Sequence, residues 1–322
     1  NSSRIGFKGA EDLGNGQSVV WQVEQGVGLD ESGGNWATRN SFLGLSGGWG
    51  TFIAGRHDTP FKSVGRKFDV FGDTIGDNRS IMGNGAVSIA GDPGISNSSA
   101  HFNRRPNNVL AYVSPNFNGL SFVGAYTTMH DAAVDGSGSP FSNEDDNNWH
   151  AFSASVTYSN GGLMLAGAFE RHNYNADFDY DGTDELADDE SNDGIRLGAS
   201  YQMNATGMGV MWENIDGRAD IDRDAWTAFL TQGFGNNTFK FQYSTVSESS
   251  VSGGANAQDA SSMWSLGMDH KMSKRTSAYA MYSSLENDQN AMRVLGNSGH
   301  GDTLSSGAGA DQSGFSVGLV HK

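Results

Sequence analysis

The stretch Arg4–Gly9 (RIGFKG), continued by Glu11–Gly16 (EDLGNG) and Ser18–Gln25 (SVVWQVEQ), decides how this chain folds. Polar and apolar residues alternate on both sides of a Gly/Asn-rich turn, and this pattern predicts a β-hairpin. Ile5 and Phe7 lie on one face of the first strand, and its basic residues lie on the other. A strand that is apolar on one face and charged on the other suits a boundary between lipid and water. The same pattern recurs along the whole chain.

The composition fits many strands joined by tight turns. Of 322 residues, 45 are Gly and only 5 are Pro, which favours frequent turns and uninterrupted strands. Hydrophobic residues make up 36%, and no run approaches the ~18 apolar residues that a membrane-spanning helix needs. The net charge of −17 argues against nucleic acid as a partner, because phosphate would be repelled. The absence of cysteine excludes disulfides, thiolate metal sites and cysteine nucleophiles.

Short and long connections between the predicted strands alternate strictly. Soluble sandwiches mix loop lengths at both ends, whereas outer-membrane barrels place short turns on the periplasmic side and long loops outside. The short joints are Asp12–Gln17, Gly47–Gly50, Ser114–Gly119, Ser159–Gly162, Met203–Thr206, Gly235–Asn237 and Met272–Arg275. The long connections are Gly26–Thr38, His57–Arg105, Thr127–Asn148, Asn173–Asp189, Asp216–Ile221, Ser247–Ala260 and Asp288–Gln312. We therefore predict an all-β protein, a transmembrane antiparallel β-barrel that occupies residues 1–322 as a single domain.

The segments between the joints have strand length and a period of two. Phe239, Phe241 and Tyr243, for example, alternate with Lys240 and Gln242. The apolar sets often end in an aromatic residue beside a turn, as an interfacial aromatic girdle would. The alternative is a soluble solenoid or sandwich with one buried face. In the segment 51–56 the pattern is irregular, because Arg56 shares the parity of Phe52, so the strand either bulges there or ends before Arg56. The parity of the segment 39–45 is equally ambiguous.

The order of several motifs resembles the general diffusion porins of Gram-negative bacteria, particularly the trimeric proteobacterial type. The resemblance covers most of the strands and fails in the loops, as is usual for surface loops. The motifs are Ser3–Gly16, Arg39–Leu45, Gly55–Pro60, Arg105–Val109 followed by Ser114–Gly119, and Gly314–Lys322.

The resemblance implies a sixteen-stranded barrel, a homotrimer and a third external loop that folds back into the pore. We count about fifteen strands here, and an odd number cannot close an antiparallel barrel with both ends in the periplasm. The family has a strand before the Arg4 motif and usually a terminal Phe after a segment like His321-Lys322. We therefore expect that the N-terminal strand of the barrel is missing from this chain.

The connection His57–Arg105 occupies the position of the third loop, and the resemblance places its acids opposite a basic barrel wall. Opposed charges across a narrow gap create a transverse field that favours polar solutes. The loop acids are Asp58, Asp69, Asp73 and Asp77, and the wall candidates are Arg4, Lys8, Arg39, Arg56 and Arg105. The alternative is that each is a solvated surface group. Residues 1–105 hold 10 basic and 10 acidic side chains, which leaves 10 basic and 27 acidic for the remainder, so a basic wall and acidic outer loops oppose each other and we expect little selectivity.

One acidic loop has the pattern of a calcium site. Asp177, Asp179 and Asp181 precede Gly182, and Asp188 stands at the twelfth position, which resembles a D-x-D-x-D-G loop. Position 12 is Asp rather than the longer bidentate Glu, and no flanking helices are evident. The alternatives are a solvated acidic loop, or carboxylates that bridge divalent cations to lipopolysaccharide phosphates. No other cofactor is predicted.

The sequence carries no enzymatic pattern that we recognise. It has no HExxH spacing, no P-loop and no GxSxG elbow. His270 has an apolar-face parity and could serve a hydrolase on the barrel wall, but a histidine in the interfacial girdle explains it better. We therefore predict a non-enzymatic outer-membrane porin for passive diffusion of ions and small hydrophilic solutes, in contact with lipid and lipopolysaccharide. The alternatives are a substrate-selective channel and a non-conducting barrel with an adhesion or scaffold role.

Overall fold

The chain folds into one antiparallel meander of strands. The computed structural model describes residues 3–28, 36–83, 102–128, 150–173, 191–217, 221–250, 257–296 and 307–322. The strands are β1 (Arg4–Gly14), β2 (Gln17–Gly26), β3 (Ser41–Gly47), β4 (Gly50–Arg56), β5 (Val109–Val113), β6 (Leu120–Thr128), β7 (His150–Asn160), β8 (Leu163–Asn173), β9 (Ser191–Met203), β10 (Thr206–Gly217), β11 (Ile221–Phe234), β12 (Asn237–Val246), β13 (Ser261–Lys271), β14 (Thr276–Asn287) and β15 (Gln312–His321).

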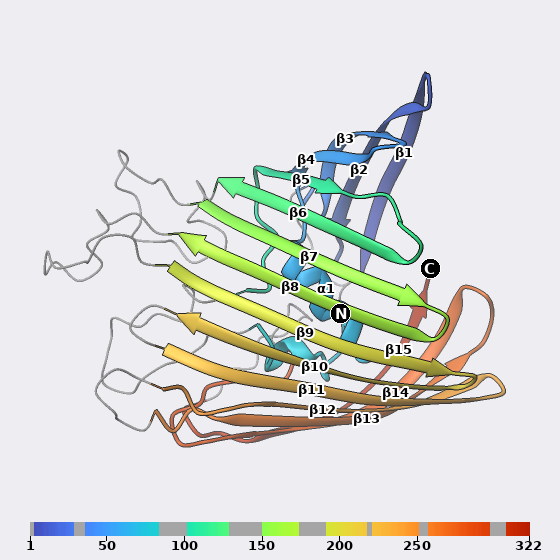
Figure 1. Ribbon diagram of the computed structural model, residues 1–322. Coiled ribbons are helices and arrows are strands. Elements are labelled where there is room, and N and C mark those ends of the chain that lie inside the picture. The colour runs from blue at the N-terminus through green and yellow to red at the C-terminus, as the bar shows by residue number, and fades with distance from the viewer. Residues whose placement is uncertain are drawn as a thin grey trace, which may run out of the picture.

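Each strand pairs with its sequence neighbours, in the order β1 to β15 (Figure 1). Within the residues that the structure describes, β1 and β15 are not paired to each other, so the curved sheet is open along one line. The predicted all-β antiparallel architecture and the count of fifteen strands are confirmed. The predicted short joints are confirmed as well, and in a meander they all lie at one end of the sheet.

The first turn shows why the opening hairpin forms. Asn15 and Gly16 separate β1 from β2, and both have positive φ, at 53° and 73°. Two consecutive positive φ values match the right-handed twist of the strands that they join, and Asn-Gly adopts them at little cost. The register then runs regularly from Asp12 opposite Ser18 to Arg4 opposite Gly26.

The two faces of the sheet differ as the alternation predicts. Leu197 and Phe241 on the outer face are about half exposed, whereas Arg196 and Gln242 beside them point inward and are buried. β4 runs through Arg56 in continuous register with β3, so its pairing contains no bulge. The irregular residue there is Gly55, whose φ of 146° is not accessible to other residues without strain.

The main apolar core lies between the sheet and the connection from β4 to β5. This connection contains α1 (Pro60–Gly65), η1 (Arg66–Phe68) and η2 (Asn78–Ser80), and α1 sits against the inner side of the curved sheet (Figure 1). None of the helices among the described residues is long and apolar enough to cross a membrane. We call the described parts of this connection, residues 57–83 and 102–108, the inner loop.

Candidate functional site: the inner loop and the facing wall

The inner loop begins with a short capped helix. The Thr59 side chain accepts a hydrogen bond from the backbone N–H of Lys62 at 3.2 Å, and Pro60 occupies the first helical turn. Both features start a helix directly after β4, where the chain would otherwise continue as a strand. The helix packs on β7, β8 and β9, so the loop turns inward instead of extending away from the barrel.

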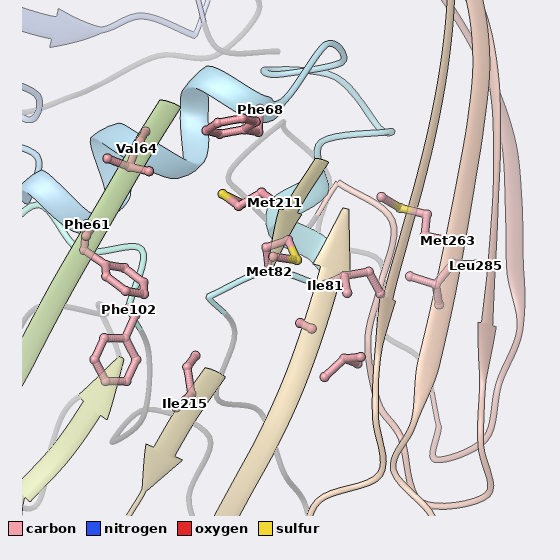
Figure 2. Close-up of a cluster of buried hydrophobic side chains, with 14 of the residues drawn as sticks. Phe61, Val64, Phe68, Ile81, Met82, Phe102, Met211, Ile215, Met263 and Leu285 are labelled. Carbon is pink, nitrogen blue, oxygen red and sulfur yellow. The ribbon is translucent and has the colours of Figure 1, made fainter. Parts of the chain in front are cut away.

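Three phenylalanine rings of the inner loop pack directly against glycines of β9. A Cβ atom added at Gly194 would lie 2.9 Å from the rings of Phe61 and Phe102, and one at Gly198 would lie 2.4 Å from Phe68. The absent side chains on β9 therefore leave space for the rings to lie directly on its backbone. Figure 2 shows these three phenylalanines together with Ile81 and Met82 of the loop, and with side chains of the wall strands.

A buried ion pair ties both legs of the loop to the wall. Arg196 of β9 lies with its Nε 2.5 Å from Glu213 Oε2 of β10. Arg196 Nη1 donates to the Phe61 carbonyl at 2.9 Å, and its guanidinium carbon lies 4.0 Å from the centroid of the Phe61 ring. Glu213 Oε1 accepts the backbone N–H of Gly83 at 2.6 Å, and Arg196 Nη2 donates to Asn103 Oδ1 at 3.3 Å. The Arg196–Glu213 pair therefore contacts the inner loop near its start, at Phe61. It also contacts the loop at Gly83 and Asn103, after the chain has crossed to the last strands.

The far end of the loop crosses to the last strands. Gln242 of β12 accepts the backbone N–H of Val70 at 3.0 Å and donates to the Gly76 carbonyl at 3.2 Å. The Phe71 ring lies 4.7 Å from Lys240 Nζ, and a Cβ at Gly314 of β15 would be 3.4 Å from Ile75. The loop therefore covers the inner face from β7 to β15 and leaves the inner face of β1–β5 as the opposite wall.

Asp58, where the loop starts, is enclosed by basic side chains. Its Oδ1 lies 2.9 Å from Lys62 Nζ and 3.0 Å from Arg105 Nε, and its Oδ2 lies 3.9 Å from Arg66 Nη1. Burial alone would raise the pKa of Asp58, but the charges of Lys62 and Arg105 outweigh burial and hold it well below its ordinary value. Burial lowers the pKa of Lys62 to about 8, although Asp58 acts in the opposite direction.

Asp73, at the far end of the loop, is shared by three arginines. Its carboxylate lies 3.2 Å from Arg4 Nη2 of β1, 3.6 Å from Arg66 Nη2 and 3.6 Å from Arg79 Nη2. Arg4 belongs to the wall, whereas Arg66 and Arg79 belong to the loop itself. Of the predicted acids, Asp73 therefore reaches the opposite wall at β1. Asp58 instead pairs with Arg105, which was predicted for the wall but lies in the returning part of the inner loop, before β5 begins.

Asp69 and Asp77 correct the prediction that the loop acids face the wall. Asp77 is 0% exposed, and both its oxygens bond within the loop, to the backbone N–H and guanidinium of Arg79 and to the backbone N–H of Asp73. The Asp69 oxygens accept the backbone N–H groups of Phe71 and Asn78. Burial raises the pKa of Asp69, and the neighbouring charge of Asp77 raises it further. These two carboxylates therefore bond within the loop and hold its shape.

The remaining wall candidates have separate partners. Arg39 pairs with Glu24 of β2 through its Nε. Arg56 donates to the Thr38 carbonyl at 3.2 Å and to Asn107 Oδ1 at 2.6 Å. Lys8 is on the same face of β1 as Arg4. Whether these side chains line the pore remains a prediction.

Sequence reasoning missed the contribution of the loop's own bases and of the pair under the loop. Lys62 follows Asp58 by four residues, so the helical turn at Pro60 was an available signal for their pairing. Arg196 and Glu213 carried no signal beyond an inward parity, because their loop partners are 93 to 135 residues away in sequence.

The predicted calcium ligands Asp177, Asp179, Asp181 and Asp188 lie outside the described residues. Among the residues that are described, no group of three or more His, Asp or Glu side chains is arranged to hold a metal ion. His270 points to the outer face and lies 2.8 Å from Asn237 Oδ1 through its Nδ1.

The profile of the Gram-negative porins matches residues 1–290 of this chain. The chain belongs to the Gram-negative porin family. Among curated proteins, this porin is similar to the major outer membrane protein P.IB of Neisseria gonorrhoeae, with 27% identity over 91% of this chain and 80% of the relative. It is also similar to P.IB of Neisseria meningitidis serogroup A, with 30% identity over 86% of this chain and 74% of the relative.

Solved porins share the fold. The anion-selective porin from Comamonas acidovorans has a TM-score of 0.75 and 23% identity, covering 99% of this chain and 89% of that one. OmpT of Vibrio cholerae has a TM-score of 0.67 and 17% identity over the same shares. The predicted family, location and function are therefore confirmed: this is a porin of the outer membrane, a channel for passive diffusion of ions and small hydrophilic solutes, and not an enzyme.

Proposed function

We propose that this porin favours small anions and assembles as a homotrimer. The observation that carries the selectivity is the surplus of basic over ionised acidic groups around the inner loop. Asp58 lies against Lys62, Arg66 and Arg105, and Asp73 is shared by three arginines. Arg66 belongs to both groups, so the distinct basic groups are five, and Asp77 pairs with one of them, Arg79. Three carboxylates, those of Asp58, Asp73 and Asp77, therefore face five basic groups, and burial raises the pKa of the fourth loop acid, Asp69.

The size of the effect depends on distance from these groups. A charge acts over a Debye length of about 8 Å at physiological ionic strength, so the guanidinium groups at the narrowest region govern passage more than acids on distant loops do. In the partly desolvated gap between the loop and the wall, opposed charges interact more strongly than in bulk water. The net charge of −17 for the whole chain therefore does not set the sign of the selectivity.

The test is the reversal potential of the purified porin in a planar bilayer under a potassium chloride gradient. We expect the reversal potential to have the sign that preferential chloride permeation produces. We expect Arg66→Gln to move this reversal potential towards zero. Arg171→Gln is the matched control, because Arg171 is exposed on the outer face and pairs with Asp193 there. A wild-type potential of zero, or of the potassium sign, would reject the anion preference.

The homotrimer is supported by the short strands on one side of the barrel. β3 and β4 have 7 residues each and β5 has 5. A strand needs about 9–11 residues to span the hydrocarbon layer at the usual tilt, so this side is too short to face lipid alone. Its exposed apolar residues, among them Leu43, Phe52 and Leu110, would be covered by neighbouring subunits. The number three follows from the resemblance to trimeric porins.

We test the assembly with native mass spectrometry of the detergent-solubilised protein. A trimer is expected, and Leu43→Arg is expected to dissociate it. A monomer from the wild type under mild detergent would reject the assembly and leave the selectivity proposal intact. The longer strands elsewhere would contact lipid and lipopolysaccharide, and Ca²⁺ binding by the acidic loop stays a prediction that calcium titration calorimetry tests.

A further inference from the structure

Two buried arginines, Arg223 and Arg293, lie outside the Asp58 and Asp73 clusters. Arg223 lies near the start of β11 with its side chain inward, and Arg293 lies in the connection from β14 to β15. Their exposed fractions are 3% and 1%. Buried arginine is rare unless its charge is paired and its N–H groups find acceptors.

The segment that carries Arg293, residues 288–296, is folded against the rim of the barrel. Arg293 Nη1 donates to the Asp259 carbonyl at 2.8 Å and lies 3.3 Å from Ser261 Oγ. The backbone N–H of Asn290 donates to the Gln258 carbonyl at 2.8 Å, and that of Leu295 donates to the side chain of Gln312 at 2.9 Å. The Leu295 side chain joins the apolar core below.

Four guanidinium nitrogens of the two arginines have no hydrogen-bond acceptor among the described residues. They are Nη1 and Nη2 of Arg223, and Nε and Nη2 of Arg293, and all four are buried. Most buried polar atoms in proteins have a partner, so four unpartnered cationic donors at one place call for an explanation. Leaving a charged donor unsatisfied costs more than leaving a neutral one.

The neighbouring carboxylates are already occupied. Glu213 and Asp259 both act on Arg223 and Arg293 electrostatically. Glu213, however, bonds to Arg196 and to the Gly83 backbone N–H. Asp259 accepts the backbone N–H of Ser249 at 2.8 Å and its hydroxyl at 2.7 Å.

The charges of this group therefore do not balance. Three guanidinium groups, those of Arg196, Arg223 and Arg293, face two carboxylates, those of Glu213 and Asp259. Burial and the charge of Arg223 together lower the pKa of Arg293 to about 9, which indicates that the two guanidinium groups are electrostatic neighbours. The group therefore lacks one negative charge. Its unpartnered guanidinium N–H groups are free to donate hydrogen bonds to the oxygens of an anion that supplies this charge.

We propose that Arg223 and Arg293 together bind a small oxyanion, a carboxylate or a phosphate, between β11 and the segment 288–296. Guanidinium groups match the paired oxygens of both anions through bidentate hydrogen bonds. Because Arg223 is fixed on the barrel and Arg293 is on the connection, an anion that contacts both fastens the segment 288–296 to the wall. The site is enclosed, so the anion enters when this segment lifts and exchanges slowly.

The experiment measures hydrogen exchange at the backbone N–H groups of Asn290 and Leu295 in the full-length porin in detergent. Samples are equilibrated with sodium phosphate, sodium acetate or sodium chloride at equal ionic strength. A ligand that binds only the closed segment slows its opening by the factor 1 + [L]/Kd, which is about 100-fold at 100 times Kd. We expect slowing by phosphate or acetate and not by chloride, and the stronger of the two identifies the anion class.

Two variants separate this site from the other arginines. Arg223→Met removes two of the unpartnered donors, and we expect it to abolish the anion-dependent slowing while the segment stays folded. Arg66→Gln alters the inner loop and is expected to retain the full effect. No slowing in the wild type by any anion would overturn the proposal, and equal slowing by chloride would overturn its oxyanion chemistry. Loss of the effect in Arg66→Gln would assign the anion to the inner loop instead. The proposal is independent of the sign of the channel's selectivity.

Discussion

Replacing Arg196 with Met is the most direct test of how the inner loop is held. The change removes the ion pair with Glu213, the bond to the Phe61 carbonyl, the bond to Asn103 and the contact with the Phe61 ring. It also leaves Glu213 buried with the Gly83 N–H as its remaining direct partner. Removing one partner of a buried pair costs about 3–5 kcal/mol, because the remaining charge is uncompensated.

We expect the lower part of that range. The positive charge of Arg223 acts on Glu213 and offsets some of the lost compensation. A cost of about 3 kcal/mol corresponds to a population of the detached loop that is larger by about two orders of magnitude. The barrel itself should remain folded, since neither the strand pairings nor the outer face depends on Arg196.

The assay is single-channel recording together with limited trypsin digestion. Detachment of the loop should appear as new conductance substates and as faster cleavage after Lys62 and Arg66. Arg171→Met is the matched control, because Arg171 also forms an ion pair, in its case with Asp193, but its side chain is 47% exposed. An exposed pair contributes about 0–1 kcal/mol, so this variant should behave like the wild type.

A double variant distinguishes the lost charge balance from lost packing. Replacing both members of a buried pair by apolar residues of similar volume is often nearly neutral, so Arg196→Met with Glu213→Leu should recover much of the quiet conductance. If Arg196→Met is as quiet and as trypsin-resistant as the wild type, the loop is held by its aromatic contacts and the reasoning is refuted.

Three further changes probe the packing, the titration and the lipid face. Gly198→Leu places a Cβ 2.4 Å from an aromatic ring of the loop, and overpacking of this kind costs about 1–3 kcal/mol. We expect this variant to show conductance substates. Gly124→Leu is the control, because the space around its Cβ is open, and it should conduct like the wild type. Burial lowers the pKa of Lys62 to about 8, so raising the pH from 7 to 9 removes most of its positive charge. This change should shift the reversal potential towards the potassium sign in the wild type, and it should not do so in Lys62→Met. Because the pKa of Lys62 is lowered by folding, the folded state binds fewer protons than the unfolded state above pH 8. Lys62 should therefore make the docked loop more stable as the pH rises towards 10. Faster trypsin cleavage of the loop over that pH range would contradict this sign. Leu197→Lys in the middle of β9 should cost about 2–4 kcal/mol in liposome refolding, and Tyr201→Lys, near the turn end of the same face, about 0–1 kcal/mol; equal costs would argue against the assigned membrane depth.

The sequence by itself determined the strands, their two faces and their order. Alternation is a local property, because successive side chains of a strand point to opposite faces wherever the strand lies. Leu197 and Arg196 could therefore be assigned to the outer and inner faces without knowing any neighbour. The tight turns were equally readable, since Asn15-Gly16 favours its turn through its own backbone preferences. Family membership followed because the strand motifs occur in a fixed order.

The tertiary structure alone decided which charges meet. Asp58, Asp69, Asp73 and Asp77 are equivalent in sequence terms, as acids on one polar loop, yet Asp73 reaches Arg4 on the wall while Asp77 is enclosed by its own loop. The contacts of Arg196 and Glu213 depend on how the inner loop packs on the inner wall. The unpartnered N–H groups of Arg223 and Arg293 depend on how the segment 288–296 packs there. Alternation specifies the face on which a side chain lies. The partner that it meets there depends on chain segments whose distance in sequence has no relation to their distance in space.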